Sequence, residues 1–225
     1  MSDRFDLEDL LNCYRRGVFP MADSRDDMRL FLMDPDMRGI LPLEDFHIPK
    51  RLAKTVRREP YRVTVDTAFA RVIDACAEFH PNRLTTWINE PIQNLYCALH
   101  RQGHAHSVEC WGDDGKLLGG LYGVSVGGAF FGESMFSRAT DASKIALVHL
   151  AARLIAGGYT LLDAQFHNPH LEQFGLIEIS RAEFRKRLNE ALDIDADFYS
   201  AGGSVGAGSS GMTGASAVQL ITQTS

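Results

Sequence analysis

Two polar residues that follow an apolar segment, Asp163 and Gln165, have the types and spacing best suited to chemistry. The segment Tyr159-Thr-Leu-Leu precedes them, so they are expected at positions i and i+2 of a strand, on one face. A carboxylate there can accept the amide N–H of the glutamine and fix its carbonyl as a directed acceptor. Such an acceptor can orient an attacking amine during acyl transfer, although a structural polar pair at a strand end is the plain alternative.

A second candidate acid, Glu133, lies in the segment AFFGESMFS, where a carboxylate and two hydroxyls stand among aromatic side chains. The apolar runs 117–126 and 129–136 flank Gly127-Gly128, and this pattern predicts a β-hairpin. Asp141 is then expected to cap a helix whose apolar residues recur periodically. The alternative is a bulged strand that enters an ordinary helix.

Histidines and serines offer two further chemistries, both with weaker support. His100, His104 and His106 pass from an expected helix through a glycine to an expected strand, which is a poor spacing for zinc. A serine nucleophile at Ser134 or Ser137 would lack the strained Gly-x-Ser-x-Gly turn. We therefore expect no metal site.

A basic stripe is expected on the helix that begins near Pro49. Lys50, Lys54, Arg57 and Arg58 recur at i, i+4, i+7 and i+8, which places four cations on one helix face without an acid among them. Such a face is often merely solvated, but it is also suited to contact with phosphates. The formal charge of −6 argues only against broad, nonspecific binding of nucleic acid by the whole surface.

Composition and the order of elements indicate the fold class. The chain has 225 residues, of which 45% are hydrophobic and 23% charged, as is typical of a soluble globular protein. No apolar run approaches the length of a membrane span, and four scattered cysteines suit the reducing cytoplasm. The expected strands and helices follow an α+β order with a central antiparallel meander, which is typical of acetyltransferase-type folds.

Three parts are expected along the chain: a small N-terminal domain over 1–38, a catalytic domain over 39–200, and a flexible Gly/Ser-rich tail over 201–225. Acetyltransferases bind the pyrophosphate of coenzyme A with a Gly-rich loop at a helix N-terminus. The corresponding segment here, 137–143, has no glycine and contains Asp141, whose charge would repel pyrophosphate. The expected acyl donor is therefore not an acyl-CoA.

Several sequence blocks, taken together, resemble those of the bacterial leucyl/phenylalanyl-tRNA–protein transferases over residues 7–199. The blocks are GVFPM, FHIPK, GESMFS, DASK and LLDAQF. The resemblance implies a small N-terminal domain packed on an acetyltransferase-like (GNAT-type) C-terminal domain. It also implies transfer of leucine or phenylalanine, and less well methionine, from aminoacyl-tRNA to the α-amine of proteins that begin with Arg or Lys. That transfer marks the acceptor for degradation by the N-end rule.

The same resemblance implies no cofactor, because an aminoacyl ester is already activated relative to an amide. From the cysteines and the lack of a long apolar run we expect a cytoplasmic protein without membrane contact, and we expect a monomer. Two rival functions stay open. One is an aminoacyl transferase whose acceptor is an antibiotic or lipid precursor, and the other is a tRNA-binding module without catalysis. The acid and amide of the LLDAQF block favour an enzyme over the second rival.

By position, the resemblance assigns Asp163, Gln165 and Glu133 to catalysis and the basic stripe to tRNA contact. Trp87 matches an aromatic residue that lines the site of the 3′-adenosine. Met21 stands where many relatives have Trp, and Leu32-Met33 replaces a Trp pair, so stacking on the adenosine is expected to differ. The pocket for the donor side chain is expected to be lined by Leu121, Phe130, Met135, Leu147, Leu150, Leu154 and Leu162.

Overall fold

The computed structural model describes residues 5–78, 85–202 and 211–224. Its strands are β1 (Phe19–Met21), β2 (Phe31–Met33), β3 (Met37–Ile40), β4 (Arg62–Val65), β5 (Ala105–Trp111), β6 (Leu117–Val126), β7 (Ala129–Ser137), β8 (Leu161–Gln165) and β9 (Ile177–Ser180). Its helices are α1 (Leu7–Arg15), α2 (Lys50–Arg57), α3 (Phe69–Cys76), α4 (Glu90–Arg101), α5 (Ala142–Ala156), α6 (Pro169–Glu172), α7 (Arg181–Leu192) and α8 (Gly214–Thr224). This mixture confirms the α+β class.

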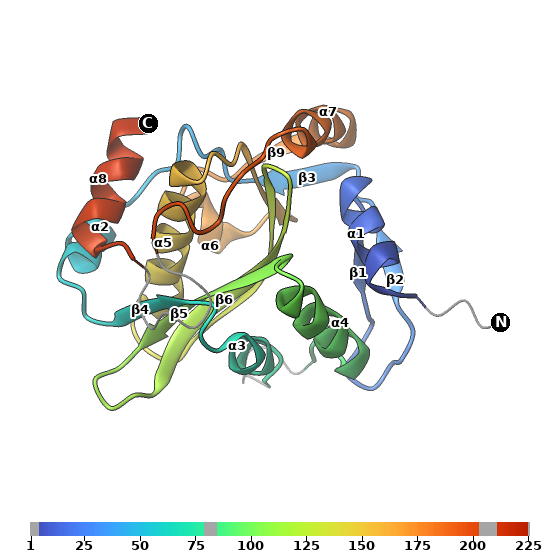
Figure 1. Ribbon diagram of the computed structural model, residues 1–225, viewed down its shortest axis with the longest axis horizontal. Coiled ribbons are helices and arrows are strands. Elements are labelled where there is room, and N and C mark those ends of the chain that lie inside the picture. Colours follow the sequence, from blue (N-terminus) through green and yellow to red (C-terminus); the bar gives the residue numbers. More distant parts are fainter. Residues whose placement is uncertain (1–4, 79–84, 203–210, 225) are drawn as a thin grey trace.

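A twisted mixed sheet runs through the molecule in the order β4-β5-β6-β7-β8-β3-β9 (Figure 1). The Gly127-Gly128 hairpin is confirmed, because β6 and β7 pair antiparallel on either side of it. β7 and β8 are parallel and are joined through α5, as a parallel pair requires a crossover. They pair only from Ala129↔Leu161 to Phe131↔Asp163. Beyond these residues the carboxyl ends of the two strands separate.

Apolar helices cover both faces of this sheet. One core cluster contains residues of α1, α3, α4 and α7, and the other contains residues of α2, α5, α6 and α8. Neighbouring strand residues belong to opposite clusters, as the two-residue period of a strand dictates: Phe130 packs in the second cluster and Phe131 in the first. The central strands are therefore apolar along most of their length. A polar residue on them is buried and needs either a hydrogen-bond partner or a functional role.

Asp141 precedes α5 but does not cap it in the expected way. Its backbone is left-handed, with φ of 59°, and its side chain makes no capping hydrogen bond to the helix. The carboxylate instead accepts from Lys144 at 3.2 Å and pairs with Arg51 of α2 at 3.4 Å. Asp141 therefore occupies the predicted N-cap position of α5, but its carboxylate bonds to these two cations and not to the helix N–H groups.

The N-terminal segment is more regular than expected. Phe19–Met21, which follows α1 and reads as a loop in the sequence, pairs with β2 in a two-stranded antiparallel sheet. The chain then enters the main sheet as β3, which lies between β8 and β9 and spans the domain boundary expected at residue 38. The division into domains stays a prediction.

Part of the segment expected as a flexible tail forms α8, which corrects that expectation for residues 214–224. The Thr213 hydroxyl accepts from the N–H of Ser216 at 3.1 Å, which is a helix cap. The helix packs against α2 and α5 and buries three apolar side chains, Ala217, Val218 and Ile221. Residues 203–210 of the expected tail lie outside the described residues. Within the described ranges, every helix is too short or too polar to cross a membrane.

Candidate active site

A cavity of about 250 Å³ lies where β7 and β8 separate. One part of its wall is apolar and another part is polar, and the two parts are contributed mainly by β6, β7, β8, α5 and α6. Its lining residues are Leu41, Leu121, Tyr122, Gly132, Glu133, Ser134, Met135, Leu147, Leu150, Leu162, Asp163, Ala164, Gln165, Asn168 and Leu171. We call it the β7–β8 cavity.

The structure brings most of the residues expected for a side-chain pocket to the β7–β8 cavity, namely Leu121, Met135, Leu147, Leu150 and Leu162. Phe130 and Leu154 are fully buried in the core and do not line it; Phe130 stacks on Phe198 with ring centres 5.9 Å apart. Leu41, which follows β3, and Leu171, which lies on α6, also line the cavity but were not predicted. Only the tertiary fold brings these two elements close to β7, so no local pattern indicates them.

Asp163 lies at the polar part of the cavity, fully buried, in a bidentate ion pair with Arg38. Nε of Arg38 donates to Oδ1 at 2.8 Å and Nη2 donates to Oδ2 at 2.7 Å. Arg38 also donates from Nη1 to the carbonyl of Gly17 at 3.0 Å. Its guanidinium lies over the rings of Phe19 and Phe184, 4.6 and 4.3 Å from their centres. These contacts fix the direction of the Asp163 carboxylate.

The Gln165 side chain does not donate to Asp163, so the expected lock on its amide is wrong. Oδ1 of Asp163 accepts from the backbone N–H of Gln165 instead, at 3.0 Å. Gln165 has a left-handed backbone with φ of 61°, a conformation that costs a residue other than glycine about 1–3 kcal/mol. Its side-chain Nε2 is buried and has no hydrogen-bond partner within the described residues. The amide thus keeps its hydrogen-bonding capacity at the cavity.

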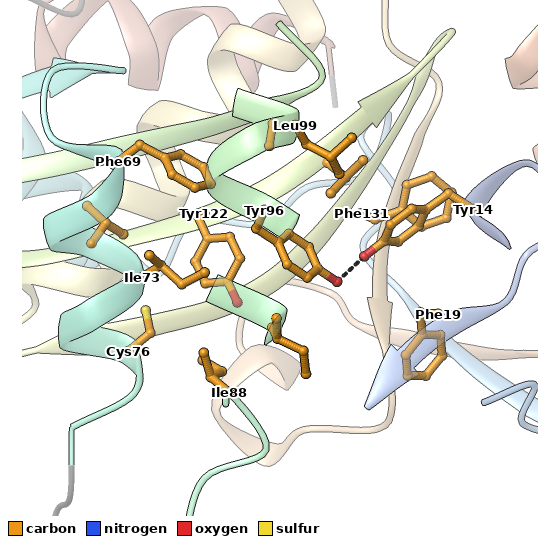
Figure 2. Close-up of a cluster of buried hydrophobic side chains, with 14 of the residues drawn as sticks. Tyr14, Phe19, Phe69, Ile73, Cys76, Ile88, Tyr96, Leu99, Tyr122 and Phe131 are labelled. Atoms are coloured by element: carbon orange, nitrogen blue, oxygen red, sulfur yellow. Dashed lines mark hydrogen bonds between the residues drawn. The ribbon is translucent and has the colours of Figure 1, made fainter. Parts of the chain in front are cut away.

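Glu133 of β7 accepts from the hydroxyls of Tyr14 and Tyr96, at 2.7 and 3.1 Å. The two tyrosines, from α1 and α4, also share a hydrogen bond (Figure 2). Burial raises the pKa of Glu133 to about 7; the tyrosine hydrogen bonds oppose this shift, and the charge of Asp163 adds to it. This carboxyl group can therefore hold or release a proton near neutral pH.

Tyr122 also borders the β7–β8 cavity, but its ring packs in the core cluster against Phe69 and Tyr96 (Figure 2). It stands on β6, and its buried hydroxyl has no hydrogen-bond partner within the described part of the chain. Buried polar atoms in proteins are nearly always hydrogen-bonded. The Gln165 amide, which has no partner at the cavity among the described residues, therefore indicates a site prepared for a polar ligand.

Met21 and Trp87 do not line the β7–β8 cavity. Both are partly buried against the core cluster that contains Tyr14 and Tyr96. Their assignment to the 3′-adenosine stays a prediction.

The basic stripe is present on α2. The side chains of Lys50, Lys54, Arg57 and Arg58 are exposed, and none of them forms an ion pair within the described ranges. The neighbouring Arg51, by contrast, pairs with Asp141. The stripe thus keeps its full charge toward solvent.

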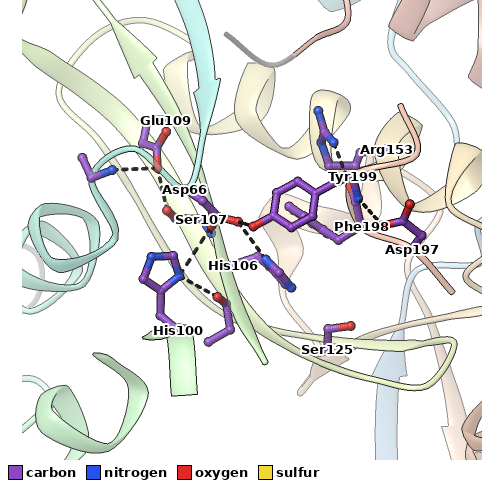
Figure 3. A network of polar contacts seen from close by, with 12 residues as sticks. Asp66, His100, His106, Ser107, Glu109, Ser125, Arg153, Asp197, Phe198 and Tyr199 are labelled. Carbon is purple, nitrogen blue, oxygen red and sulfur yellow. Dashed lines mark hydrogen bonds and ion pairs between the residues drawn. The ribbon is translucent and has the colours of Figure 1, made fainter. Parts of the chain in front are cut away.

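Two of the three histidines that were considered as metal ligands, His100 and His106, lie beside a buried carboxylate. Nδ1 of His106 lies 2.8 Å and Nδ1 of His100 lies 3.7 Å from the carboxylate of Asp66, in a buried network (Figure 3). No group of three metal-ligating side chains occurs in the part of the chain that the structure describes.

Comparison with known proteins gives two matching family models. Residues 40–189 match the leucyl/phenylalanyl-tRNA protein transferases, and residues 3–36 match the N-terminal domain of those transferases. A leucyl/phenylalanyl-tRNA–protein transferase of Hyphomonas neptunium is 75% identical over 206 residues, which are 92% of this chain and 79% of the relative. One from Caulobacter vibrioides is 61% identical over 225 residues, the full length of both chains.

A solved structure, that of L-PGS from Bacillus licheniformis, superposes with a TM-score of 0.42 at 14% identity, over 81% of this chain and 68% of that one. This similarity is too low to assign a fold or a function.

Proposed function

The chain belongs to the leucyl/phenylalanyl-tRNA protein transferase family, and we propose that it transfers leucine or phenylalanine from aminoacyl-tRNA to the α-amine of acceptor proteins. It is an aminoacyltransferase by this membership. We further propose methionine as a weaker donor and proteins beginning with Arg or Lys as acceptors, which the transfer marks for N-end-rule degradation. The proposed setting is the cytoplasm, where the enzyme acts as a monomer.

The observation that carries this proposal is the composition of the β7–β8 cavity. Its leucine and methionine walls suit an apolar side chain, and its volume of about 250 Å³ is small enough to select by shape. The Gln165 amide, whose Nε2 has no hydrogen-bond partner within the described residues, lines the same cavity as the acids Asp163 and Glu133. An aminoacyl ester needs both kinds of wall, one for its side chain and one for its reacting end.

The reaction joins an amine to an ester. The acceptor nitrogen attacks the carbonyl carbon, a C–N bond forms, and the C–O bond to the 3′-oxygen of the tRNA breaks. A proton leaves the nitrogen and a proton reaches the departing oxygen. The ester supplies the driving force, so positioning and electrostatic stabilisation provide the rate.

We assign the polar residues to these needs. Gln165 is a neutral amide and too weak a base to deprotonate the amine, so its carbonyl accepts from the amine and aims it. Asp163, fixed by Arg38, holds the backbone of Gln165 and supplies negative charge as the nitrogen becomes positive. Glu133, whose pKa is raised to about 7 by burial, takes and returns the transferred proton.

The basic stripe on α2 is proposed to contact tRNA phosphates outside the cavity. Its four exposed cations lack ion-pair partners within the described ranges, which supports contact with an external polyanion over a merely structural role. The separation of the two binding surfaces has a useful consequence. A donor that ends at the 3′-aminoacyl-adenosine should use the cavity without the stripe.

We propose the GNAT type for the main sheet. Its support is the parallel pair β7–β8, which pairs at one end and separates at the other, with α5 following β7. Asp141 at the start of α5 disfavours pyrophosphate there, which is consistent with a donor other than acyl-CoA.

Mass spectrometry of a peptide with N-terminal Arg, incubated with the enzyme and leucyl-tRNA, tests the proposed function. The expected product is heavier by one leucine residue at the N-terminus, and an acetylated peptide should not react. If the tRNA binds but no peptide gains leucine, the protein is a binding module. If a non-peptide amine reacts and the peptide does not, the acceptor is wrong.

A further inference from the structure

The C-terminal helix α8 lies outside the segment 40–189 that matches the family, yet it is packed into the catalytic part of the molecule. α8, α2 and α5 lie side by side, and each contacts the other two (Figure 1). α2 carries the basic stripe, and α5 supplies Leu147 and Leu150 to the β7–β8 cavity. α8 therefore touches both elements that the proposed donor must use.

Close backbone contact joins the start of α8 to the end of α2. The N–H of Gly214 donates to Oε1 of Glu59 at 2.6 Å, directly after the last residues of the stripe. A Cβ added at Gly214 would lie 2.1 Å from the carbonyl oxygen of Val56, so only glycine permits this approach. α2 is thus contacted by α8 at its carboxyl end and by Asp141, which precedes α5, through the ion pair with Arg51.

Charge also matters at this junction. Glu59 directly follows Arg58 of the stripe in sequence, and its carboxylate binds the first turn of α8, where the helix dipole is positive. Within the described ranges it forms no ion pair with the stripe. The segment 201–225 itself has no charged residue, so α8 adds no acid that would neutralise the stripe.

We propose that α8 is a positioning element for tRNA binding, which holds α2 so that its basic stripe faces the phosphates of the donor. The inference rests on the proposed contact of that stripe with tRNA. α8 itself touches no reacting atom. Its loss should impair the use of full-length aminoacyl-tRNA and spare the use of a donor that lacks the tRNA body.

The test uses the full chain with neutral substitutions on the buried face of α8, Val218→Asn/Ile221→Asn, because they detach the helix without changing charge. The matched control is Gln219→Asn/Gln223→Asn on its exposed face. A milder variant, Gly214→Ala, pushes α8 from Val56, and Ala215→Ser is its control. Each protein is assayed with leucyl-tRNA and with 3′-leucyl-adenosine, across salt concentrations, and its fold is checked by circular dichroism.

For Val218→Asn/Ile221→Asn and for Gly214→Ala, we expect KM for leucyl-tRNA to rise. The log–log slope of tRNA binding against salt concentration should flatten by about 0.7–1.8, which corresponds to one or two lost phosphate contacts. The kcat with leucyl-adenosine and both control variants should stay at the wild-type values. Equal losses with both donors would assign α8 a purely structural role and overturn the proposal, as would unchanged KM for leucyl-tRNA. An Arg57→Ala/Arg58→Ala protein with an unchanged slope would instead refute the stripe itself, independently of α8.

Discussion

Two buried acidic regions of this molecule differ in how completely their polar groups are satisfied. In the first, Asp66 accepts from His106, Tyr199 and the backbone of Ser107 (Figure 3). Beside it, Glu109 accepts from hydroxyls of Ser107 and two threonines. We call this the Asp66 network. In the second, at the β7–β8 cavity, the Gln165 side-chain amide has no hydrogen-bond partner in the described part of the chain.

The difference teaches how to separate a structural acid from a functional one. Both regions contain a buried acid with several donors, so burial and charge do not distinguish them. The acids of the Asp66 network bond to donors within the network, and the ring of Phe198 stacks on His106 with ring centres 3.9 Å apart. The cavity instead has a fixed acid, Asp163, next to the Gln165 amide, whose Nε2 has no partner in the described part of the chain. Spare capacity beside a preorganised charge is typical of a site that awaits substrate.

The largest expected effect comes from neutralising the central acid of each region, Asp163 and Asp66. Asp163→Asn should lower kcat by about 10²–10³, as does the loss of one preorganised hydrogen-bonding group, with donor binding nearly intact. Asp66→Asn should lower the melting temperature and leave kcat per folded molecule unchanged. Single-turnover transfer from leucyl-tRNA to an Arg-peptide measures both.

Removing Asp163 also leaves Arg38 buried without its partner, which costs about 3–5 kcal/mol of stability. The rates must therefore be divided by the folded fraction from circular dichroism. If the folded Asp163→Asn protein transfers leucine at the wild-type rate, Asp163 has only a structural role. The cavity would then not differ from the Asp66 network in this respect.

The apolar wall of the cavity gives the next effect. Leu147→Trp should fill the space and abolish phenylalanine transfer, while Leu154→Met, a matched change in the core outside the cavity, should not. In the wild type, β-branched isoleucine should be used about 10–200-fold less efficiently than leucine, since one misplaced methyl costs about 1–3 kcal/mol. Competition between the two charged tRNAs measures this ratio, and equal use would contradict the account of the pocket.

Sequence could predict one half of this site and not the other. Asp163 and Gln165 lie on one short strand, so their i, i+2 spacing was sufficient to pair them, whereas Leu147 and Leu150 of α5 were assigned to the pocket by the family resemblance. Arg38 is 125 positions from its carboxylate partner and Tyr14 is 119 from Glu133. No local pattern reports such contacts, and the left-handed turn at Gln165 is imposed by tertiary structure.

The C-terminal helix was missed for a different reason. The segment 201–216 consists mostly of Gly, Ser and Ala, and that composition outweighed a helix signal that begins near its end. Thr213 and Ser216 have the spacing of a helix cap, and Ala217, Val218 and Ile221 have the spacing of one buried helix face. The fold class, the hairpin and the order of elements needed only local pattern.

A smaller effect is expected for exposed cations, which also divide into those with an acidic partner and those without one in the described ranges. Arg57→Ala/Arg58→Ala should flatten the log–log salt dependence of tRNA binding by about 0.7–0.9 per lost phosphate contact. The control Lys116→Ala/Arg185→Ala removes the same charge from residues paired with Asp114 and Asp34, and should leave the slope unchanged. A slope that changes equally in both variants would mean that net charge, and not the stripe, governs binding.

The smallest expected effect is a difference in how the stability contributed by each buried acid depends on pH. Burial raises the pKa of Glu133 from 4.5 to about 7, so the folded state keeps a proton that the unfolded state has lost in this range. The wild type should thus lose stability relative to Glu133→Gln as pH rises from about 4.5 to about 7, and the difference should level off above that.

Asp66 should show the opposite sign. Burial would raise its pKa, but the hydrogen bonds and charge of His106, with Tyr199 and Ser107, outweigh burial and lower it below 3.8. The stability that it contributes is present above pH 3.8 and is lost as pH falls through the lowered pKa, so the wild type should gain on Asp66→Asn as pH rises there. Melting temperatures of the three proteins over both pH ranges measure the two differences. A Glu133→Gln difference that is flat from pH 4.5 to 7 would remove the titratable carboxyl from the cavity, and with it the proposed proton acceptor.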